Sequence, residues 1–182
     1  MKSYVQISLL LLLIIATVSS GFGQEKLWKE LNLKLVELYR AGKYQEAAEV
    51  AQHAIEVAER TFGPDHPRVA VSQNNLATLY RLEGRYAEAE SLYKRALKIK
   101  QSAFGPNHPE VATGLNNLAG VYRAQSEYDK AQPLYERALA IREQTLSADH
   151  PDLGQSLNNL GLIYKVQGRY VEAELMYKRA LT

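Results

Sequence analysis

A regular spacing of apolar side chains follows Pro67 and predicts a helix that runs to a turn at Gly84. The members of this apolar stripe are Val69, Leu76, Leu79 and Tyr80. Pro67 suits the first helical position, because the N–H that proline lacks would have no partner there. Asp65 and His66 come directly before it and are candidates to cap the free N–H groups of the first turn. Cap, proline and stripe together indicate a helix that buries one of its sides.

A second helix is predicted from Tyr86 to about Ala103, where Gly105 and Pro106 end it. Its apolar side alternates small and large residues, which are Ala89, Leu92, Tyr93, Ala96 and Leu97. The alanines leave room for the bulky tyrosines of the facing helix and of the next unit. Because neither helix can bury its apolar side alone, we expect such helix pairs to stack on one another.

The same pattern returns every 42 residues. The element before the first helix occurs as Gly63-Pro64-Asp65-His66-Pro67, as Gly105-Pro106-Asn107-His108-Pro109 and as Ser147-Ala148-Asp149-His150-Pro151. Three asparagine doublets keep the same interval, Asn74-Asn75, Asn116-Asn117 and Asn158-Asn159, as do Tyr80, Tyr122 and Tyr164. A weaker unit lies upstream, where Asn32, Gly42, Tyr44, Ala47 and Ala54 match Asn74, Gly84, Tyr86, Ala89 and Ala96. We therefore predict an all-α chain with a divergent first repeat over 24–62 and further repeats over 63–104, 105–146 and 147–182.

The motif Asn75-Leu76-Ala77-x-x-Tyr80, with Gly84-x-Tyr86-x-x-Ala89 and Tyr93-x-x-Ala96, resembles the tetratricopeptide repeat. The 42-residue period and the Gly-Pro-Asp-His-Pro linker are similar to the kinesin-light-chain type of that family. The resemblance covers nearly all of the chain after residue 24. It implies a right-handed superhelical solenoid of antiparallel helix pairs, which serves as a protein–protein interaction scaffold in an exported bacterial protein. A sensory or regulatory repeat region of a larger signalling or enzymatic protein is the alternative.

In this family the first helix of each unit lines a concave groove that holds a peptide. On the helix from Pro67, the residues Asn74, Thr78 and Arg81 are spaced to share a face. The candidate groove residues are the asparagines Asn32, Asn74, Asn116 and Asn158, the neighbouring Asn75, Asn117 and Asn159, and the cations Arg81, Arg123 and Lys165.

The chemistry of these candidate side chains predicts the kind of peptide. An asparagine amide both donates and accepts, which suits a peptide backbone of any sequence. Arginine and lysine suit carboxylates. The expected partner is therefore an extended, acidic peptide or the C-terminus of a protein. Two alternatives stay open: the second asparagine of each doublet bonds within the solenoid, and the cations complement the helix dipole.

Composition narrows the possible partners and cofactors further. The chain has no cysteine, which rules out disulfides, thiolate nucleophiles and cysteine-bound zinc. Its 22 basic side chains are interleaved with 20 acidic ones, and no basic run suggests nucleic-acid binding. Most of the twelve tyrosines recur at fixed helical positions, which is typical of a packed core. We expect a protein partner, no nucleic acid and no cofactor.

Catalytic and metal chemistry has no evident place in the sequence. His66, His108 and His150 recur one per unit, and neighbouring helices lie ~8–10 Å apart, whereas zinc needs its ligands at ~2.0–2.1 Å. They cannot share an ion, so we expect each histidine to order its own linker. The paired acids Glu88 and Glu90 belong to a predicted outward face rich in lysine and arginine, where solvation explains them. We predict that the chain is not an enzyme.

The first 23 residues are typical of a secretory signal peptide. A single charge, Lys2, precedes an apolar run from Ile7 to Val18, and small residues follow. The run is shorter than the ~20 residues that span a bilayer, so we expect no stable membrane span after cleavage. Cleavage is predicted after Ser20 or after Gly23, which would make the protein periplasmic or secreted. A buried N-terminal helix is the alternative.

The end of the chain at Thr182 falls about two turns short of where the other second helices end. An apolar face of the last unit would then stay uncovered. We expect either a longer gene product or self-association through this last repeat.

Overall fold

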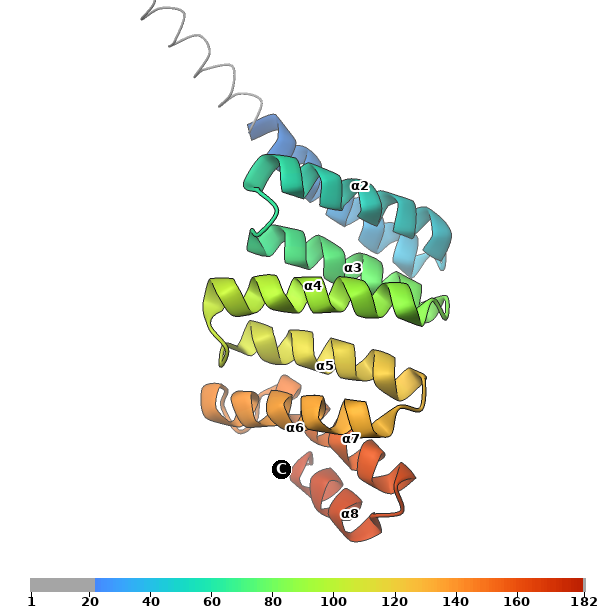
Figure 1. The fold of residues 1–182 in the computed structure, drawn as a ribbon, viewed down its shortest axis with the longest axis vertical. Coiled ribbons are helices and arrows are strands. Elements are labelled where there is room, and N and C mark those ends of the chain that lie inside the picture. The colour runs from blue at the N-terminus through green and yellow to red at the C-terminus, as the bar shows by residue number, and fades with distance from the viewer. Residues whose placement is uncertain (1–21, 182) are drawn as a thin grey trace, which may run out of the picture. The chain divides into compact units, whose positions relative to one another are not determined.

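The computed structural model describes residues 22–181, and this part of the chain is helical throughout, with short connections. Residues 22–40 form the first helical segment. It is followed by α2 (Tyr44–Phe62), α3 (Pro67–Leu82), α4 (Tyr86–Phe104), α5 (Pro109–Ala124), α6 (Tyr128–Thr145), α7 (Pro151–Val166) and α8 (Tyr170–Arg179). The chain divides into two compact units after Ser72, within α3. Figure 1 shows the order of the helices along the chain. The all-α prediction and the solenoid of helix pairs are confirmed.

The first unit pairs the segment 22–40 with α2. Leu35 and Leu38 are buried on the former, and four alanines of α2 are wholly buried, namely Ala47, Ala51, Ala54 and Ala58. Trp28 closes one end of the unit: its ring meets Phe62 edge-on at 5.9 Å, and its indole N–H donates to Ser72 over 2.9 Å. The small side chains on the buried side of α2 therefore leave room for larger side chains to pack closely against it.

In the second unit, each first helix packs between two second helices. α5 contacts α4 and α6, and α7 contacts α6 and α8, which places α4, α5 and α6 side by side (Figure 1). Tyr93 and Tyr135 are 1% exposed although they are large, and the alanines around them are wholly buried, namely Ala89, Ala96, Ala131 and Ala138. The predicted alternation of small and large side chains is confirmed.

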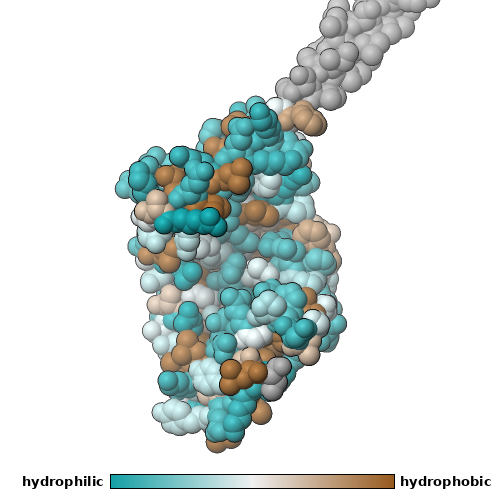
Figure 2. Space-filling model, turned by 180° about the vertical axis from the view of Figure 1, so that it is seen from behind, coloured by the Kyte–Doolittle hydropathy of each residue, from teal (hydrophilic) through white to brown (hydrophobic). Residues whose placement is uncertain are grey.

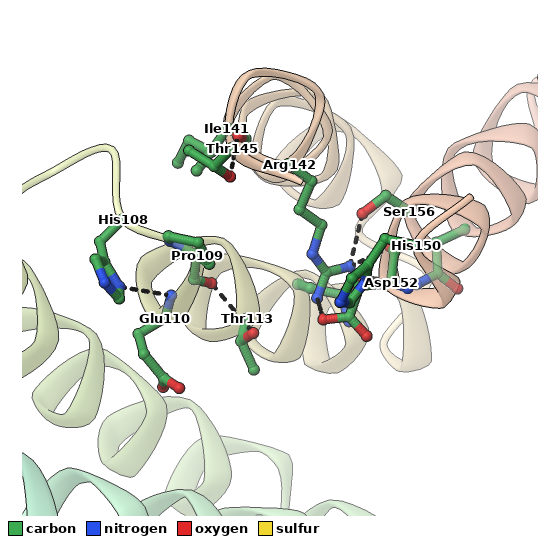
Figure 3. Close-up of polar contacts among 12 residues, drawn as sticks. His108, Pro109, Glu110, Thr113, Ile141, Arg142, Thr145, His150, Asp152 and Ser156 are labelled. Atoms are coloured by element: carbon green, nitrogen blue, oxygen red, sulfur yellow. Dashed lines mark hydrogen bonds and ion pairs between the residues drawn. The ribbon is translucent and has the colours of Figure 1, made fainter. Parts of the chain in front are cut away.

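The linkers order the start of each first helix through histidine. The Nδ1 atom of His108 accepts a hydrogen bond from the backbone N–H of Glu110 over 3.1 Å (Figure 3). His66 and His150 accept in the same way from the N–H of Arg68 and of Asp152, each over 3.1 Å. The prediction that each histidine orders its own linker is confirmed, and the cap is the histidine rather than the aspartate before it.

Buried cations link the end of one repeat to the start of the next. Arg142 of α6 is 2% exposed and donates to the backbone oxygen of Asp152 over 2.8 Å and to the hydroxyl of Ser156 over 2.7 Å (Figure 3). At the same position one repeat earlier, Lys100 of α4 pairs with Glu110 over 2.7 Å. Burial lowers the pKa of the Arg142 guanidinium, while the charge of Asp152 raises it. The carboxylate offsets part of the desolvation of this cation.

The turn between the two helices of a pair requires one residue in the left-handed backbone conformation, with positive φ. Gly84 and Gly168 have φ angles of 76° and 77° there, and Ser126 takes the same place with φ of 62°. Ser126 is the one non-glycine residue with positive φ among the described residues. A side chain at such a position costs about 1 kcal/mol.

We expect Ser126→Gly to raise the free energy of unfolding by about 0.5–1 kcal/mol, because glycine adopts this conformation without strain. Urea denaturation of both proteins measures the difference. The control is Ser126→Ala, which keeps a Cβ atom and should give no such gain. Equal effects of the two substitutions would contradict the explanation.

The predicted signal peptide lies almost entirely outside the described residues, which begin at Phe22. Within 22–181, none of the helices combines the length and the apolar character needed to cross a membrane. Cleavage and export therefore stay predictions.

Candidate functional site

One face of each first helix carries a row of exposed or half-buried side chains along its length. After the first two residues of α5, the exposed or half-buried positions are Thr113, Asn116, Asn117, Gly120, Arg123 and Ala124. Their spacing of three and four residues makes them one stripe along the helix. The same positions are open on α7 and on the part of α3 in the second unit, at Gln155, Asn158, Asn159, Leu162, Lys165 and Val166, and at Asn74, Asn75, Thr78, Arg81 and Leu82. We call this set of stripes the first-helix face.

The predicted groove residues of the second unit all lie on the first-helix face. Asn158 and Lys165 are exposed, and the other predicted asparagines and both arginines are half-buried. Seen from behind, hydrophilic and hydrophobic side chains are intermixed over the visible surface (Figure 2). Helix spacing therefore predicted correctly that these side chains share a face. Their role in binding stays a prediction.

Asn32 belongs to the first unit, where its surroundings are different. Its Nδ2 atom donates to the backbone oxygen of Trp28 over 2.7 Å, one turn earlier. The positions that follow it on the same side of the segment are apolar and exposed, with Leu33, Val36 and Tyr39 at 67%, 42% and 41%. The matching face of the first unit is thus more apolar than the first-helix face of the second unit.

One hydrogen bond between asparagine doublets connects α5 with α7. Asn159 Nδ2 of α7 donates to Asn116 Oδ1 of α5 over 2.8 Å. For this second asparagine, the alternative of a bond within the solenoid is therefore realised. The bond also fixes the amide of Asn116, whose Oδ1 is engaged. Asn74 Oδ1 is buried and has no partner among the described residues.

Two buried tyrosines of the second helices contact residues of the first-helix face through their hydroxyl groups. The sequence analysis did not predict these contacts. The hydroxyls of Tyr93 and Thr78 are hydrogen-bonded over 2.8 Å. The hydroxyl of Tyr135 lies 3.8 Å from the place that a Cβ atom would take at Gly120. Their spacing in the sequence assigns both tyrosines to the core. It does not show which group the hydroxyl at the end of each buried ring contacts.

Arg123 approaches the same tyrosine hydroxyl. Burial raises the pKa of Tyr135, while the charge of Arg123, a hydrogen bond from Arg123 and the charge of Arg81 lower it. The Nε atom of Arg123 is buried without a partner among the described residues. The charges of both arginines therefore act on this buried hydroxyl.

The outward acids that the sequence analysis assigned to solvation differ from each other. Glu88 pairs with Arg85, which lowers the pKa of the carboxyl, and is exposed as expected. Glu90 accepts from Lys94 over 2.6 Å and from the Tyr122 hydroxyl of the next repeat over 2.9 Å. These bonds, that of Lys94 first, lower the pKa of Glu90. For Glu90 the solvation hypothesis was incomplete, because this side chain also connects two repeats.

A family model described as tetratricopeptide repeat matches residues 27–102, 80–144 and 110–182, which together make up most of the chain. The chain belongs to the tetratricopeptide repeat family. Tetratricopeptide repeats generally mediate protein–protein interaction, and their scaffold is typically non-enzymatic. No curated protein sequence matches the chain at a significant level.

Solved structures of kinesin-light-chain-like tetratricopeptide repeats are similar to this chain. BtubC (BKLC) from P. vanneervenii is 32% identical with a TM-score of 0.78, and the match covers 84% of this chain and 61% of that one. A putative kinesin light chain with nearly identical TPR-like repeats from Podosopora anserina is 26% identical with a TM-score of 0.75, and the match covers 84% and 72% of the two chains. The predicted resemblance to repeats of this type is confirmed.

The last tetratricopeptide repeat carries a hollow of about 540 Å³ between the linker that precedes α7, α7 itself and the end of α8. Among its lining residues are His150, Asn158, Arg179 and Leu181. In the preceding repeat, α7 packs against α6, and Asn159 bonds to Asn116, the residue that matches Asn158 of the hollow. Within residues 22–181, no group of three or more histidine, aspartate and glutamate side chains is close enough together to hold a metal ion.

Proposed function

We propose that the chain is a scaffold that holds an extended, acidic segment of another protein on its first-helix face. The observation that carries the proposal is the placement of Arg81, Arg123 and Lys165 on one open face at repeat spacing. Asparagine amides lie two turns away from each of them on the same face. Action by binding and not by catalysis agrees with a scaffold that is typically non-enzymatic.

The hydrogen bonds of the face support a role for Asn116 in reading the peptide backbone. Because Asn116 Oδ1 already accepts from Asn159, its Nδ2 group is the part left to donate. Backbone carbonyl oxygens of an extended peptide accept such bonds regardless of sequence. The cations would then select acidic side chains through charge-assisted hydrogen bonds, which are stronger than neutral ones.

Reversing the three cations of the face tests the proposal. We expect the combined substitutions Arg81→Glu, Arg123→Glu and Lys165→Glu to weaken binding of a fluorescein-labelled octaglutamate peptide at least about 100-fold. The reason is that hydrogen bonds between charged groups contribute about 1.5–3 kcal/mol each and are replaced by repulsion. Fluorescence anisotropy measures the dissociation constant.

The matched control reverses three exposed arginines at the same 42-residue spacing on the second helices, Arg95, Arg137 and Arg179. Both variants change the net charge equally, so an effect of overall charge would weaken binding in both. Specific binding on the first-helix face predicts a loss in the first variant alone. Unchanged affinity in that variant would remove the acidic peptide from the proposal.

The expectation of export is also part of the proposed function. The basic start, the apolar run to Val18 and the small residues after it support a periplasmic or secreted scaffold. N-terminal sequencing of the mature protein should begin at Gly21 or Gln24. An intact Met1 in the exported fraction would refute this cleavage.

Self-association has a specific observation in its favour. The hollow beside α7 and α8 matches the region where α7 itself packs in the preceding repeat. We propose that a first helix of a second copy can occupy it. Light scattering of the wild type and of Leu181→Glu measures this: a mass that falls towards that of a monomer in the variant supports the proposal, and a wild type that is monomeric at high concentration refutes it.

A further inference from the structure

One position of the first-helix face differs in every repeat of the second unit. It is occupied by Thr78 on α3, by Gly120 on α5 and by Leu162 on α7. Fifteen residues after this position, the second helix of each repeat carries a tyrosine, at Tyr93, Tyr135 and Tyr177. The hydroxyl of Tyr93 lies against Thr78 and that of Tyr135 against Gly120. The residue on the first helix therefore decides what the tyrosine hydroxyl can do.

In the repeat of α3 and α4, the hydroxyl beneath the face is already engaged. The Thr78 and Tyr93 oxygens are 2.8 Å apart, and Thr78 also donates to the backbone oxygen of Asn74 over 2.9 Å. The Tyr93 hydroxyl is therefore the donor in the bond between the two side chains. No proton of this pair is left for a ligand.

In the repeat of α5 and α6, glycine removes that partner. Apart from its chain neighbours and the backbone of its own helix, a Cβ atom built at Gly120 has only the Tyr135 hydroxyl within 4 Å, at 3.8 Å, so a side chain would fit there without collision. Tyr135 is 1% exposed, which fixes its ring in the core and its hydroxyl below the face. The space that threonine fills in one repeat is therefore open in the next.

The charge around this opening is positive. Arg123 is one helical turn beyond Gly120 on the same stripe, half-buried, with its Nε atom buried and without a partner among the described residues. Its charge and that of Arg81 act on the Tyr135 hydroxyl and favour the ionised form, against the effect of burial. A tyrosine hydroxyl is a donor as well as an acceptor, so the Tyr135 hydroxyl can donate its proton to a group held above Gly120.

We propose that the repeat of α5 and α6 holds a carboxylate of the partner above Gly120, where the Tyr135 hydroxyl donates to it and Arg123 and Arg81 supply the balancing charge. The site rests on the proposed function and adds which repeat reads the acid. Gly120 is its specificity-determining residue, because the threonine or leucine of the other repeats would fill the space. An acidic side group or the C-terminus of the partner protein can provide the carboxylate.

Two substitutions test the site, one that fills the opening and one that removes the hydroxyl donor. Gly120→Thr copies the arrangement of Thr78 and Tyr93, fills the opening and engages the Tyr135 hydroxyl. Tyr135→Phe removes only the hydroxyl. We expect each to weaken binding of octaglutamate about 10-fold, the value for one lost hydrogen bond to a charged group. The control is Tyr93→Phe, whose hydroxyl is already engaged by Thr78 and whose loss should leave the affinity unchanged.

Thermal unfolding verifies that the variants are folded. If Tyr135→Phe destabilises the core, Gly120→Thr alone still tests the site, because threonine is not a poorer helix residue than glycine.

Two peptide probes separate the sources of the carboxylate: octaglutamate with an amidated end, and a glycine–serine octapeptide with a free end. Sensitivity of either probe to Gly120→Thr supports the site and identifies the source. Unchanged binding in both Gly120→Thr and Tyr135→Phe, while charge reversal of the face still abolishes it, would overturn this site and leave the proposed function standing.

Discussion

Arg142→Ala is expected to lower the free energy of unfolding by about 2–4 kcal/mol, because it empties a buried position that links two repeats. The substitution leaves the Asp152 carbonyl and the Ser156 hydroxyl without the donor they share (Figure 3). It also removes a side chain that is 2% exposed and packed between α6 and α7. Urea denaturation followed by circular dichroism measures the change.

The ion pair itself should contribute less than the buried hydrogen bonds. The Asp152 carboxylate lies 3.5 Å from the guanidinium and its side chain is 47% exposed, so water screens the pair. We expect Asp152→Asn to cost about 1 kcal/mol or less, and the exposed Arg137→Ala to cost no more than about 0.5 kcal/mol. A loss in Arg142→Ala as small as that in Arg137→Ala would show that Arg142 does not connect the repeats.

Leu118→Ala is expected to destabilise the protein by about 3 kcal/mol, the centre of the range for buried leucine to alanine changes. Leu118 follows the asparagine doublet on α5, is 4% exposed and belongs to the core of the second unit. Alanines of the same core, such as Ala131 and Ala138, are small and wholly buried, so they cannot expand to fill the space. Denaturant unfolding gives the free energy directly.

The control for Leu118→Ala lies on the same helix and the opposite side. Ala124→Ser changes an exposed residue of α5 and should stay within about 0.5 kcal/mol of the wild type. If Leu118→Ala behaved like this surface change, the apolar stripe of α5 would not be the side that stacking buries. The prediction of stacked helix pairs would then lose its energetic basis.

The elements of the fold could be predicted from the sequence because their signals are local and occur three times. Pro67, Pro109 and Pro151 each begin a helix as expected, and the turns at Gly84 and Gly168 come where positive φ is required. Helix spacing alone also placed Asn116 and Arg123 on one face. Repetition strengthened each of these inferences, because an accidental pattern would not recur at the same interval.

The contacts that determine the chemistry of the face could not be predicted in the same way. Arg142 resembles any exposed arginine in the sequence, and its burial depends on Ser156 of the following repeat. The bond between Asn159 and Asn116 joins residues 43 positions apart, at a distance that only stacking sets. The position of the Tyr135 hydroxyl below Gly120 likewise follows from how deeply α6 packs against α5, which periodicity does not encode.

The measurement that tests the central claim most directly maps a bound acidic peptide onto the protein by nuclear magnetic resonance. Titration of octaglutamate into isotope-labelled protein should shift the side-chain amide signals of Asn116 and Asn158 and the signals of Arg123, all on the first-helix face. The outward residues of the second helices, such as Arg95 and Arg137, should keep their positions. Shifts confined to those outward residues, with the asparagine amides unchanged, would contradict binding on the first-helix face.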